Sequence, residues 1–210
     1  MLKTFEECEK KFFLKYIQKV SLPQRSAIFE KGKKIHALAN YYLNSFDISK
    51  MEKTLNADEK ATWESLKSNK YFQFDVVNTE YSLTCKVGDY WVGGRLDAFI
   101  KDGNDYIILD YKTGNIPQNA EQDFQTITYL LCADKLLNKK GGYETLKFIY
   151  LGLKKNEKKE IILTPKLKSE YEQKIISVCD KINNTIASQV QQNNSPSCTK
   201  CEYDKLCQIF

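Results

Sequence analysis

Long hydrophobic runs, a strong net charge and repeated histidine are all lacking in this sequence. The N-terminal stretch MLKTFEECEKKFFLKYI alternates charged with aromatic residues, which is typical of neither a secretory signal nor a membrane span. We therefore expect a cytoplasmic protein with no membrane partner. A net charge of +5 weakly favours an anionic partner, although many proteins that never contact nucleic acid carry a similar charge.

The length and the residue patterns indicate one mixed α/β domain over residues 1–210, with a partly antiparallel sheet flanked by helices. No internal repeat is present. A T-x-x-E capping box begins the first expected helix. Helices are predicted over residues 4–20, 26–46, 58–69, 119–138 and 166–191, and strands over 71–112 (three strands), 146–154 and 160–164.

The two turns within residues 71–112 fix a strand register. A two-residue turn at Gly103-Asn104 pairs Asp97 with Asp110 when residues are counted back along both strands. The same count across the Gly88-Asp89 turn pairs Glu80 with Asp97. The register therefore predicts carboxylates from three adjacent strands in one row.

Carboxylates this close need a positive charge between them. Cross-strand neighbours have Cβ atoms about 4.5–5.5 Å apart, where like charges destabilise a sheet. Mg²⁺ or Mn²⁺ suits such a site, and Lys112 and Arg95 flank it. The alternative is an ordinary surface face on which arginine and lysine neutralise the acids.

The same residues resemble the core of the PD-(D/E)xK nuclease superfamily. The segment "GGRLDAF…ILDYKTG" contains D-x12-D-x-K and is similar to the RecB-type branch of that superfamily. An upstream G-x-x-x-H motif places His36, the only histidine, in the position that this branch uses. A Q-x-x-x-Y motif follows the lysine and consists of Gln125 and Tyr129.

The resemblance implies a restriction-endonuclease-like sheet and a role for each motif residue. His36, Asp97 and Asp110 would hold the metal with the backbone carbonyl of Tyr111, and Lys112 would position or activate the attacking water. Glu80 would bind a second metal or hold a basic side chain. Arg95, Gln125 and Tyr129 would contact the substrate strand, or the last two would brace Lys112.

The seven cysteines divide into two groups. Cys85, Cys132 and Cys179 lie singly in predicted strands or helices and are expected in the core. Four others could form a metal site: Cys8, Cys198, Cys201 and Cys207. A set of four thiolates suits either a 4Fe–4S cluster or structural Zn²⁺.

The resemblance favours the cluster, because some RecB-type nucleases staple their ends with one N-terminal and three C-terminal cysteines. The CRISPR-associated exonuclease, AddB-type subunits and eukaryotic exonuclease V are examples. Residues 1–20 and 192–210 would form the stapled end. The expected function is a metal-dependent DNA exonuclease acting on single-stranded ends. It would serve CRISPR adaptation with integration proteins, or DNA repair with a helicase; the alternative is a non-catalytic DNA-end-binding subunit.

Overall fold

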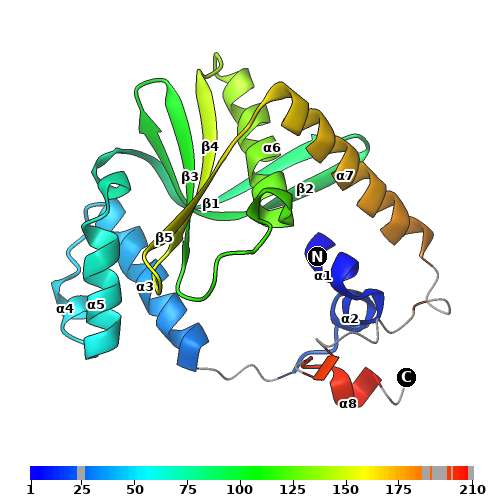
Figure 1. Cartoon of the computed structure of the whole chain (residues 1–210), viewed down its shortest axis with the longest axis horizontal. Coiled ribbons are helices and arrows are strands. Elements are labelled where there is room, and N and C mark those ends of the chain that lie inside the picture. The colour runs from blue at the N-terminus through cyan, green and yellow to red at the C-terminus, as the bar shows by residue number, and fades with distance from the viewer. Residues whose placement is uncertain (23–26, 186–189, 191–197, 200, 208–210) are drawn as a thin grey trace. The chain divides into compact units, whose positions relative to one another are not determined.

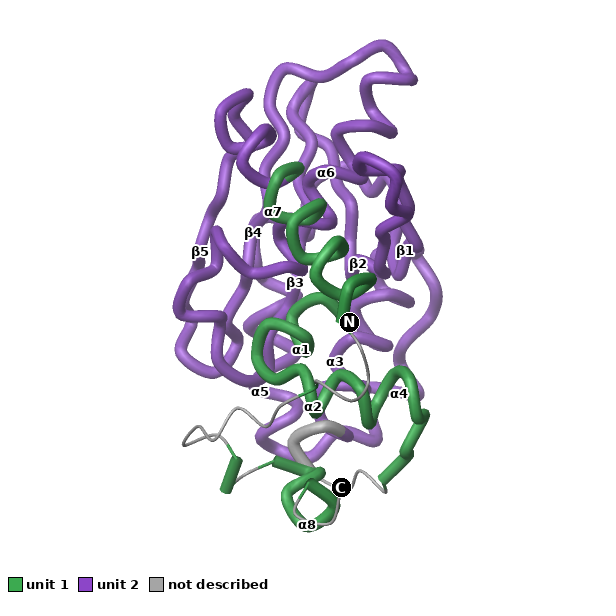
Figure 2. Tube along the Cα trace, turned by 90° about the vertical axis from the view of Figure 1, so that its right-hand side faces the viewer, with its two compact units in different colours: residues 1–24, 172–210 green, residues 25–171 purple. Residues whose placement is uncertain are grey.

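A computed structural model describes residues 1–22, 27–185, 190, 198–199 and 201–207. The chain divides into two compact units (Figure 2). Met1–Gln24 and Glu172–Phe210 form the first, here called the terminal unit, and Arg25–Tyr171 form the second, called the sheet unit. Within the described residues, none of the helices combines the length and the apolar character needed to cross a bilayer.

The sheet unit is built on five strands in the order β1-β2-β3-β4-β5 (Figure 1). Pairing is antiparallel except between β3 and β4, so the sheet is mixed, as predicted. The strands are β1 (Asp75–Val87), β2 (Tyr90–Asp102), β3 (Asp105–Lys112), β4 (Thr145–Gly152) and β5 (Glu157–Ile162). Gly88 and Gly103 have φ of 56° and 61°, which the two tight turns require and which glycine adopts without strain.

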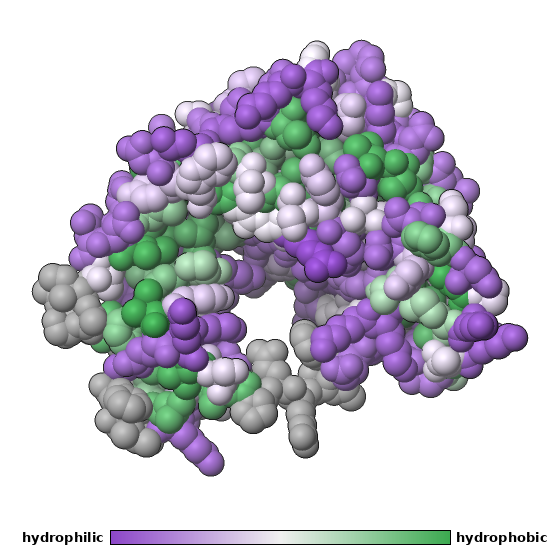
Figure 3. Space-filling model, turned by 180° about the vertical axis from the view of Figure 1, so that it is seen from behind, coloured by the Kyte–Doolittle hydropathy of each residue, from purple (hydrophilic) through white to green (hydrophobic). Residues whose placement is uncertain are grey.

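Helices cover both faces of this sheet. On one face, α3 (Ala27–Leu43) and α5 (Ala57–Lys67) pack with a core that includes Trp63, Ile100 and Leu109. On the other face, α6 (Phe124–Lys139) forms the crossover between the parallel strands β3 and β4. Shorter elements complete the unit: α4 (Ser49–Glu52), η2 (Lys70–Gln73) and η3 (Ala120–Gln122). The surface seen in Figure 3 is largely hydrophilic, with only small apolar patches.

The terminal unit contains α1 (Leu2–Glu7), α2 (Glu9–Phe12), the π-helix η1 (Phe13–Ile17) and α8 (Asp204–Cys207). Helix α7 (Pro165–Asn184) starts in the sheet unit and continues into the terminal unit. Two contacts join the N- and C-terminal segments. The Tyr203 hydroxyl donates to the Val20 carbonyl at 2.8 Å, and Lys15 lies 3.5 Å from Glu202.

The first predicted helix differs from the observed one. The capping box of Thr4 does not form, because α1 already begins at Leu2, and Cys8 interrupts the helix in an extended conformation. The Cys8 sulfur then accepts a hydrogen bond from the Lys11 amide at 3.4 Å. The break brings the rings of Phe5 and Phe12 to 5.3 Å, whereas seven residues of straight helix span about 10 Å. The last predicted helix also ends earlier than expected, at Asn184.

Candidate active site

The candidate site lies where β2 and β3 separate. The regular pairing of these strands ends at Ala98 and Leu109, immediately before Asp97 and Asp110. The Tyr111 amide donates to Asp97 Oδ2 at 2.9 Å and so bridges the two strands beyond that point. Both hairpins have the register that turn counting predicted.

Glu80 lies opposite Asp97 in that register, because its two neighbours pair with the two neighbours of Asp97. His36 comes from α3 and completes a group of three whose ligand atoms all lie within 4.8 Å of one another. It is the one such group in the part of the chain that the structure describes. An imidazole with two carboxylates is a nitrogen and oxygen donor set of the kind that binds hard divalent cations.

His36 is oriented by both of its ring nitrogens. Nδ1 lies 3.1 Å from Asp97 Oδ1, and Nε2 lies 2.9 Å from the Tyr111 carbonyl. A carbonyl and an ionised carboxylate both only accept hydrogen bonds, so the two contacts favour the imidazolium form, with a proton on each nitrogen, in keeping with the raised pKa of His36. The Tyr111 carbonyl, predicted as a metal ligand, therefore accepts a hydrogen bond from the imidazole here.

Asp110 lies outside the group of three. Its Oδ2 is 2.7 Å from Lys112 Nζ, and the Gln125 amide donates to its Oδ1. Lys112 also donates to Gln125 Oε1 at 3.0 Å, so Gln125 braces both charged side chains. The three predicted carboxylates therefore do not form one group. Asp110 is only 2% exposed, and a carboxylate buried to this extent needs a counter-charge, which Lys112 supplies.

The electrostatic environment shifts two pKa values in this site. The pKa of Asp110 is raised to about 6, chiefly by burial and then by the nearby charge of Asp97, while Lys112 and His36 act in the opposite direction. Burial lowers the pKa of His36, but the hydrogen bond and charge of Asp97 outweigh it, so the net shift is upward. Two raised pKa values within one small cluster are typical of functional sites.

Glu80 is held in an unusual backbone conformation. Its φ is 47°, a left-handed value that is uncommon for a residue with a side chain. The adjacent Thr79 hydroxyl donates to Asn40 Oδ1 at 2.5 Å, and the Asn44 amide donates to Thr79 Oγ1 at 2.6 Å. Arg95 Nε lies 2.6 Å from Glu80 Oε2 and fixes the carboxylate itself. Glu80 therefore both holds a basic side chain and belongs to the group of three.

The sequence analysis missed Asn40, Asn44 and Thr79. A signal was available for the asparagines, because they follow His36 by four and eight residues and so lie on the same face of a helix. Thr79 has no comparable signal, since a threonine in a strand is ordinary.

Tyr129 contacts the backbone of β2. Its hydroxyl donates to the Arg95 carbonyl at 2.5 Å, and burial raises its pKa to about 12. The ring covers Gly94 so closely that a Cβ atom there would lie 2.5 Å from it. Gly94 therefore permits this contact, and Tyr129 holds the strand that carries Asp97.

The cysteines in the described part of the chain are free thiols. Cys85, Cys132 and Cys179 are buried, as predicted. The four other cysteines belong to the terminal unit, and burial together with the charges of Cys8, Cys201 and Cys198 raises the pKa of Cys207. Among the described residues, no three sulfur atoms lie within 4.8 Å of one another. The cysteine cluster therefore stays a prediction.

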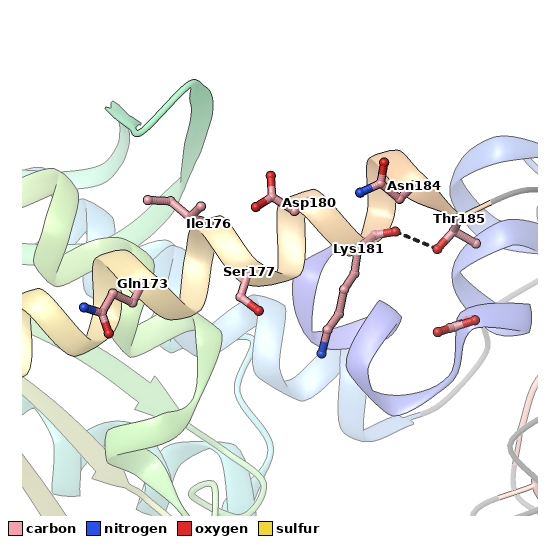
Figure 4. A pocket seen from close by; sticks show the side chains of 8 residues that line it. Gln173, Ile176, Ser177, Asp180, Lys181, Asn184 and Thr185 are labelled. Carbon is pink, nitrogen blue, oxygen red and sulfur yellow. Dashed lines mark hydrogen bonds between the residues drawn. The ribbon is translucent and has the colours of Figure 1, made fainter.

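A cavity of about 730 Å³ in the terminal unit is unrelated to these residues. It is lined by Glu9, by one face of α7 from Gln173 to Asn184 and by Thr185 directly after the helix, as Figure 4 shows. None of its lining residues was predicted as a site residue.

Comparison with known proteins establishes the family. A family model of the PD-(D/E)XK nuclease superfamily matches residues 50–208, so the chain belongs to that superfamily. The match includes Glu80, Asp97, Asp110 and Lys112, whereas His36 precedes it. No curated protein matches the chain.

Two solved structures match the chain, and the first of them is similar in fold. One is a candidate exonuclease from Eubacterium rectale, with 10% sequence identity and a TM-score of 0.56 over 95% of this chain and 80% of that one. The other is SSO0001, with 16% identity over 97% of this chain and 95% of that one. Its TM-score of 0.39 supports no structural conclusion.

Proposed function

We propose that the chain is a metal-dependent DNA exonuclease that hydrolyses phosphodiester bonds at single-stranded ends. One observation carries this proposal. The ligand atoms of His36, Glu80 and Asp97 all lie within 4.8 Å of one another, beside the ion pair of Asp110 and Lys112. The superfamily supports nuclease chemistry, and the particular reaction is our inference.

The donor set fits Mg²⁺ or Mn²⁺. Asp110 Oδ2 is buried and accepts no hydrogen bond of good geometry, in spite of its contact with Lys112, so it retains capacity for a cation. His36, Asp97 and Asp110 would hold the ion, with Glu80 as a further ligand. When bound, the ion would supply Lewis-acid polarisation of the scissile phosphate and activation of water.

Lys112 would act on the substrate directly. Its ammonium is held by Asp110 and Gln125, so it presents a fixed positive charge where negative charge develops on the phosphate. Tyr129 and Arg95 would keep β2 in place beside the substrate strand. Two biological settings would use this chemistry. One is CRISPR adaptation, together with integration proteins, and the other is DNA repair, together with a helicase.

Cys8, Cys198, Cys201 and Cys207 would hold a 4Fe–4S cluster, with Zn²⁺ as the alternative. The fit rests on the chemistry of four thiols within one compact unit, where burial and, after it, the charge of Cys8 raise the pKa of Cys207. The cluster would tie residues 1–20 to the C-terminal segment and would take no part in phosphodiester hydrolysis.

Digestion of end-labelled single-stranded DNA with Mn²⁺ or Mg²⁺ tests the nuclease proposal. Lys112→Ala and Asp97→Ala should each reduce nucleotide release at least about 100-fold, because each removes charge stabilisation from the reacting phosphate. Lys147→Ala is the matched control, since Lys147 forms the equivalent ion pair with Asp105 at 3.2 Å outside the site. EDTA should abolish release by the wild-type protein.

Undiminished cleavage by the Lys112 and Asp97 variants would contradict the assignment. If the wild-type protein binds DNA ends and releases no nucleotide with either metal, the chain is the non-catalytic end-binding subunit instead.

A further inference from the structure

A groove along the outer edge of β1 has the composition of a nucleic-acid-binding surface. Its volume is about 580 Å³, and it lies between the β1–β2 hairpin and the C-terminal half of α6. Its charged and aromatic lining residues are Tyr81, Lys86, Trp91, Asp134, Lys135, Lys139 and Lys168. Nothing in the candidate site uses these side chains.

We propose that this groove binds the single strand of DNA that leads into the candidate site, with Trp91 stacked on a base and the lysines on phosphates. The proposal rests on the proposed nuclease function, because the strand in the groove is the substrate of that site.

The charge of the groove favours a polyanion. Among the described residues that line it, Asp134 is the one acid, and its carboxylate lies 2.8 Å from Lys168 Nζ. Tyr143 and Asn138 donate to the other oxygen of Asp134, so this acid is fully neutralised and buried. Lys86, Lys135 and Lys139 give the lining a positive excess, which the fully exposed Asp89, 3.5 Å from Lys86 Nζ and outside the lining, offsets only in part.

Trp91 supplies the stacking surface. It is 74% exposed, whereas the other tryptophan, Trp63, is fully buried. Trp91 pairs with Lys86 across the hairpin, so indole and ammonium project from the same face of the two strands. Aromatic rings interleaved with cationic side chains are the combination that single-strand-binding surfaces use.

One strand and one helix connect the groove with the candidate site. Tyr81 lines the groove and follows Glu80 directly on β1. Helix α6 contacts Asp110 through Gln125 and lines the groove through Lys135, ten residues later. That distance is about 15 Å of helix, which a few nucleotides span.

An added peptide strand is the other occupant that an open sheet edge invites. Lys135 Nζ already donates to the Lys86 carbonyl on this edge, so the edge is partly capped by a cationic side chain. The positive charge and the capped carbonyl both favour nucleic acid over a peptide.

Trp91 makes the proposal measurable in the full-length protein. Adding oligo(dT) of about 12 nucleotides in EDTA should quench tryptophan fluorescence, because Trp63 is shielded and Trp91 is not. Binding should weaken steeply between about 50 and 200 mM salt. Unchanged fluorescence at saturating oligo(dT), or inorganic polyphosphate competing as well as oligo(dT), would overturn the role of Trp91.

Variants are compared by the anisotropy of labelled oligo(dT), also in EDTA. Trp91→Ala should weaken binding about tenfold or more, and the double variant Lys86→Gln/Lys139→Gln should weaken it and make the salt dependence shallower. Lys50→Gln/Lys60→Gln removes the same charge from exposed positions on α4 and α5 and should bind as the wild type does. Equal binding by all three variants would overturn the proposal.

The two proposals fail in different ways. Because binding is measured without a metal, loss of binding in the groove variants supports the groove even if no cleavage is ever seen. Conversely, cleavage by a protein whose groove variants bind normally would refute the groove and leave the nuclease function standing.

Discussion

At the scale of single residues, Asp110 is a buried carboxylate of the proposed active site that destabilises the folded protein when it is ionised. It is 2% exposed, and its folded pKa of about 6 lies above the ordinary value of 3.8 because of burial and the charge of Asp97. The folded state therefore binds a proton more tightly than the unfolded state does. The contribution of the Asp110 carboxyl to the free energy of unfolding is therefore fully present below about pH 4, and it is lost as the pH rises through about 6.

Replacing Asp110 should therefore stabilise the protein while inactivating it. In EDTA near pH 8, Asp110→Asn should raise the free energy of unfolding by about 1–3 kcal/mol, because a pKa difference of one unit corresponds to about 1.4 kcal/mol. The gain should vanish below about pH 4, where the wild-type carboxyl is protonated in both states. Urea denaturation across this pH range measures the gain, and metal-dependent cleavage should be lost.

Asp105→Asn on the same strand is the control with the opposite sign. Hydrogen bonds from Thr145 and Lys147 lower the pKa of Asp105, so its charge contributes stability at neutral pH that is lost on acidification. Asp105→Asn should therefore weaken the fold near pH 8. A loss of stability in both variants would contradict our account of Asp110.

At the scale of elements, the hairpins were predictable and the contacts between helices and strands were not. A two-residue turn with glycine at positive φ fixes the pairing register of the two strands that it joins. Counting residues back from the turn therefore placed Glu80 opposite Asp97 correctly. The same counting could not show that β2 and β3 separate beyond Ala98, where Asp110 contacts Gln125 of α6 and Lys112 of its own strand. That outcome depends on packing between distant segments.

The break at Cys8 was hidden for a related reason. Cys8 belongs to the apolar side of the predicted helix, so helical periodicity continues through it without interruption. The interruption at Cys8 brings the rings of Phe5 and Phe12 together, a contact that a pattern of spacings does not encode. His36, Gln125 and Tyr129 were found only through resemblance to a family.

The contact between α3 and β1 gives a prediction at this scale. Asn40 on α3 accepts from Thr79 and thereby holds the backbone that turns Glu80 toward His36 and Asp97. Thr79→Val keeps the shape of the side chain and removes this hydrogen bond together with the one from Asn44, so Mn²⁺ affinity should fall about 10-fold. Titration calorimetry with Mn²⁺ measures the change.

Thr84→Val provides the comparison, because it makes the same substitution at an exposed position on the same strand. Its Mn²⁺ affinity should equal that of the wild type. If Thr79→Val lowers the unfolding temperature and leaves Mn²⁺ affinity unchanged, Thr79 is structural and does not position Glu80.

At the scale of the whole molecule, the two ends of the chain belong to one compact unit. Hydrogen bonding of Tyr203 to Val20 and the ion pair of Lys15 with Glu202 join the two segments. An exposed ion pair and one hydrogen bond contribute little net stability, whereas closing so long a loop is entropically costly. A cluster held by the four cysteines would offset that cost.

Loss of one cysteine of the proposed cluster should therefore act on the entire terminal unit. Cys8→Ser should reduce iron and sulfide, or zinc, to background in anaerobically purified protein and lower the unfolding temperature by about 10 °C. Cys8→Ser/Cys207→Ser should be no less stable than either single variant, because one missing ligand already abolishes the site. Cys179→Ala, at a buried cysteine of the same unit outside the set, should retain its full metal content. Full metal content in Cys8→Ser, or stabilities that simply add in the double variant, would show that the two ends are not joined through these thiols.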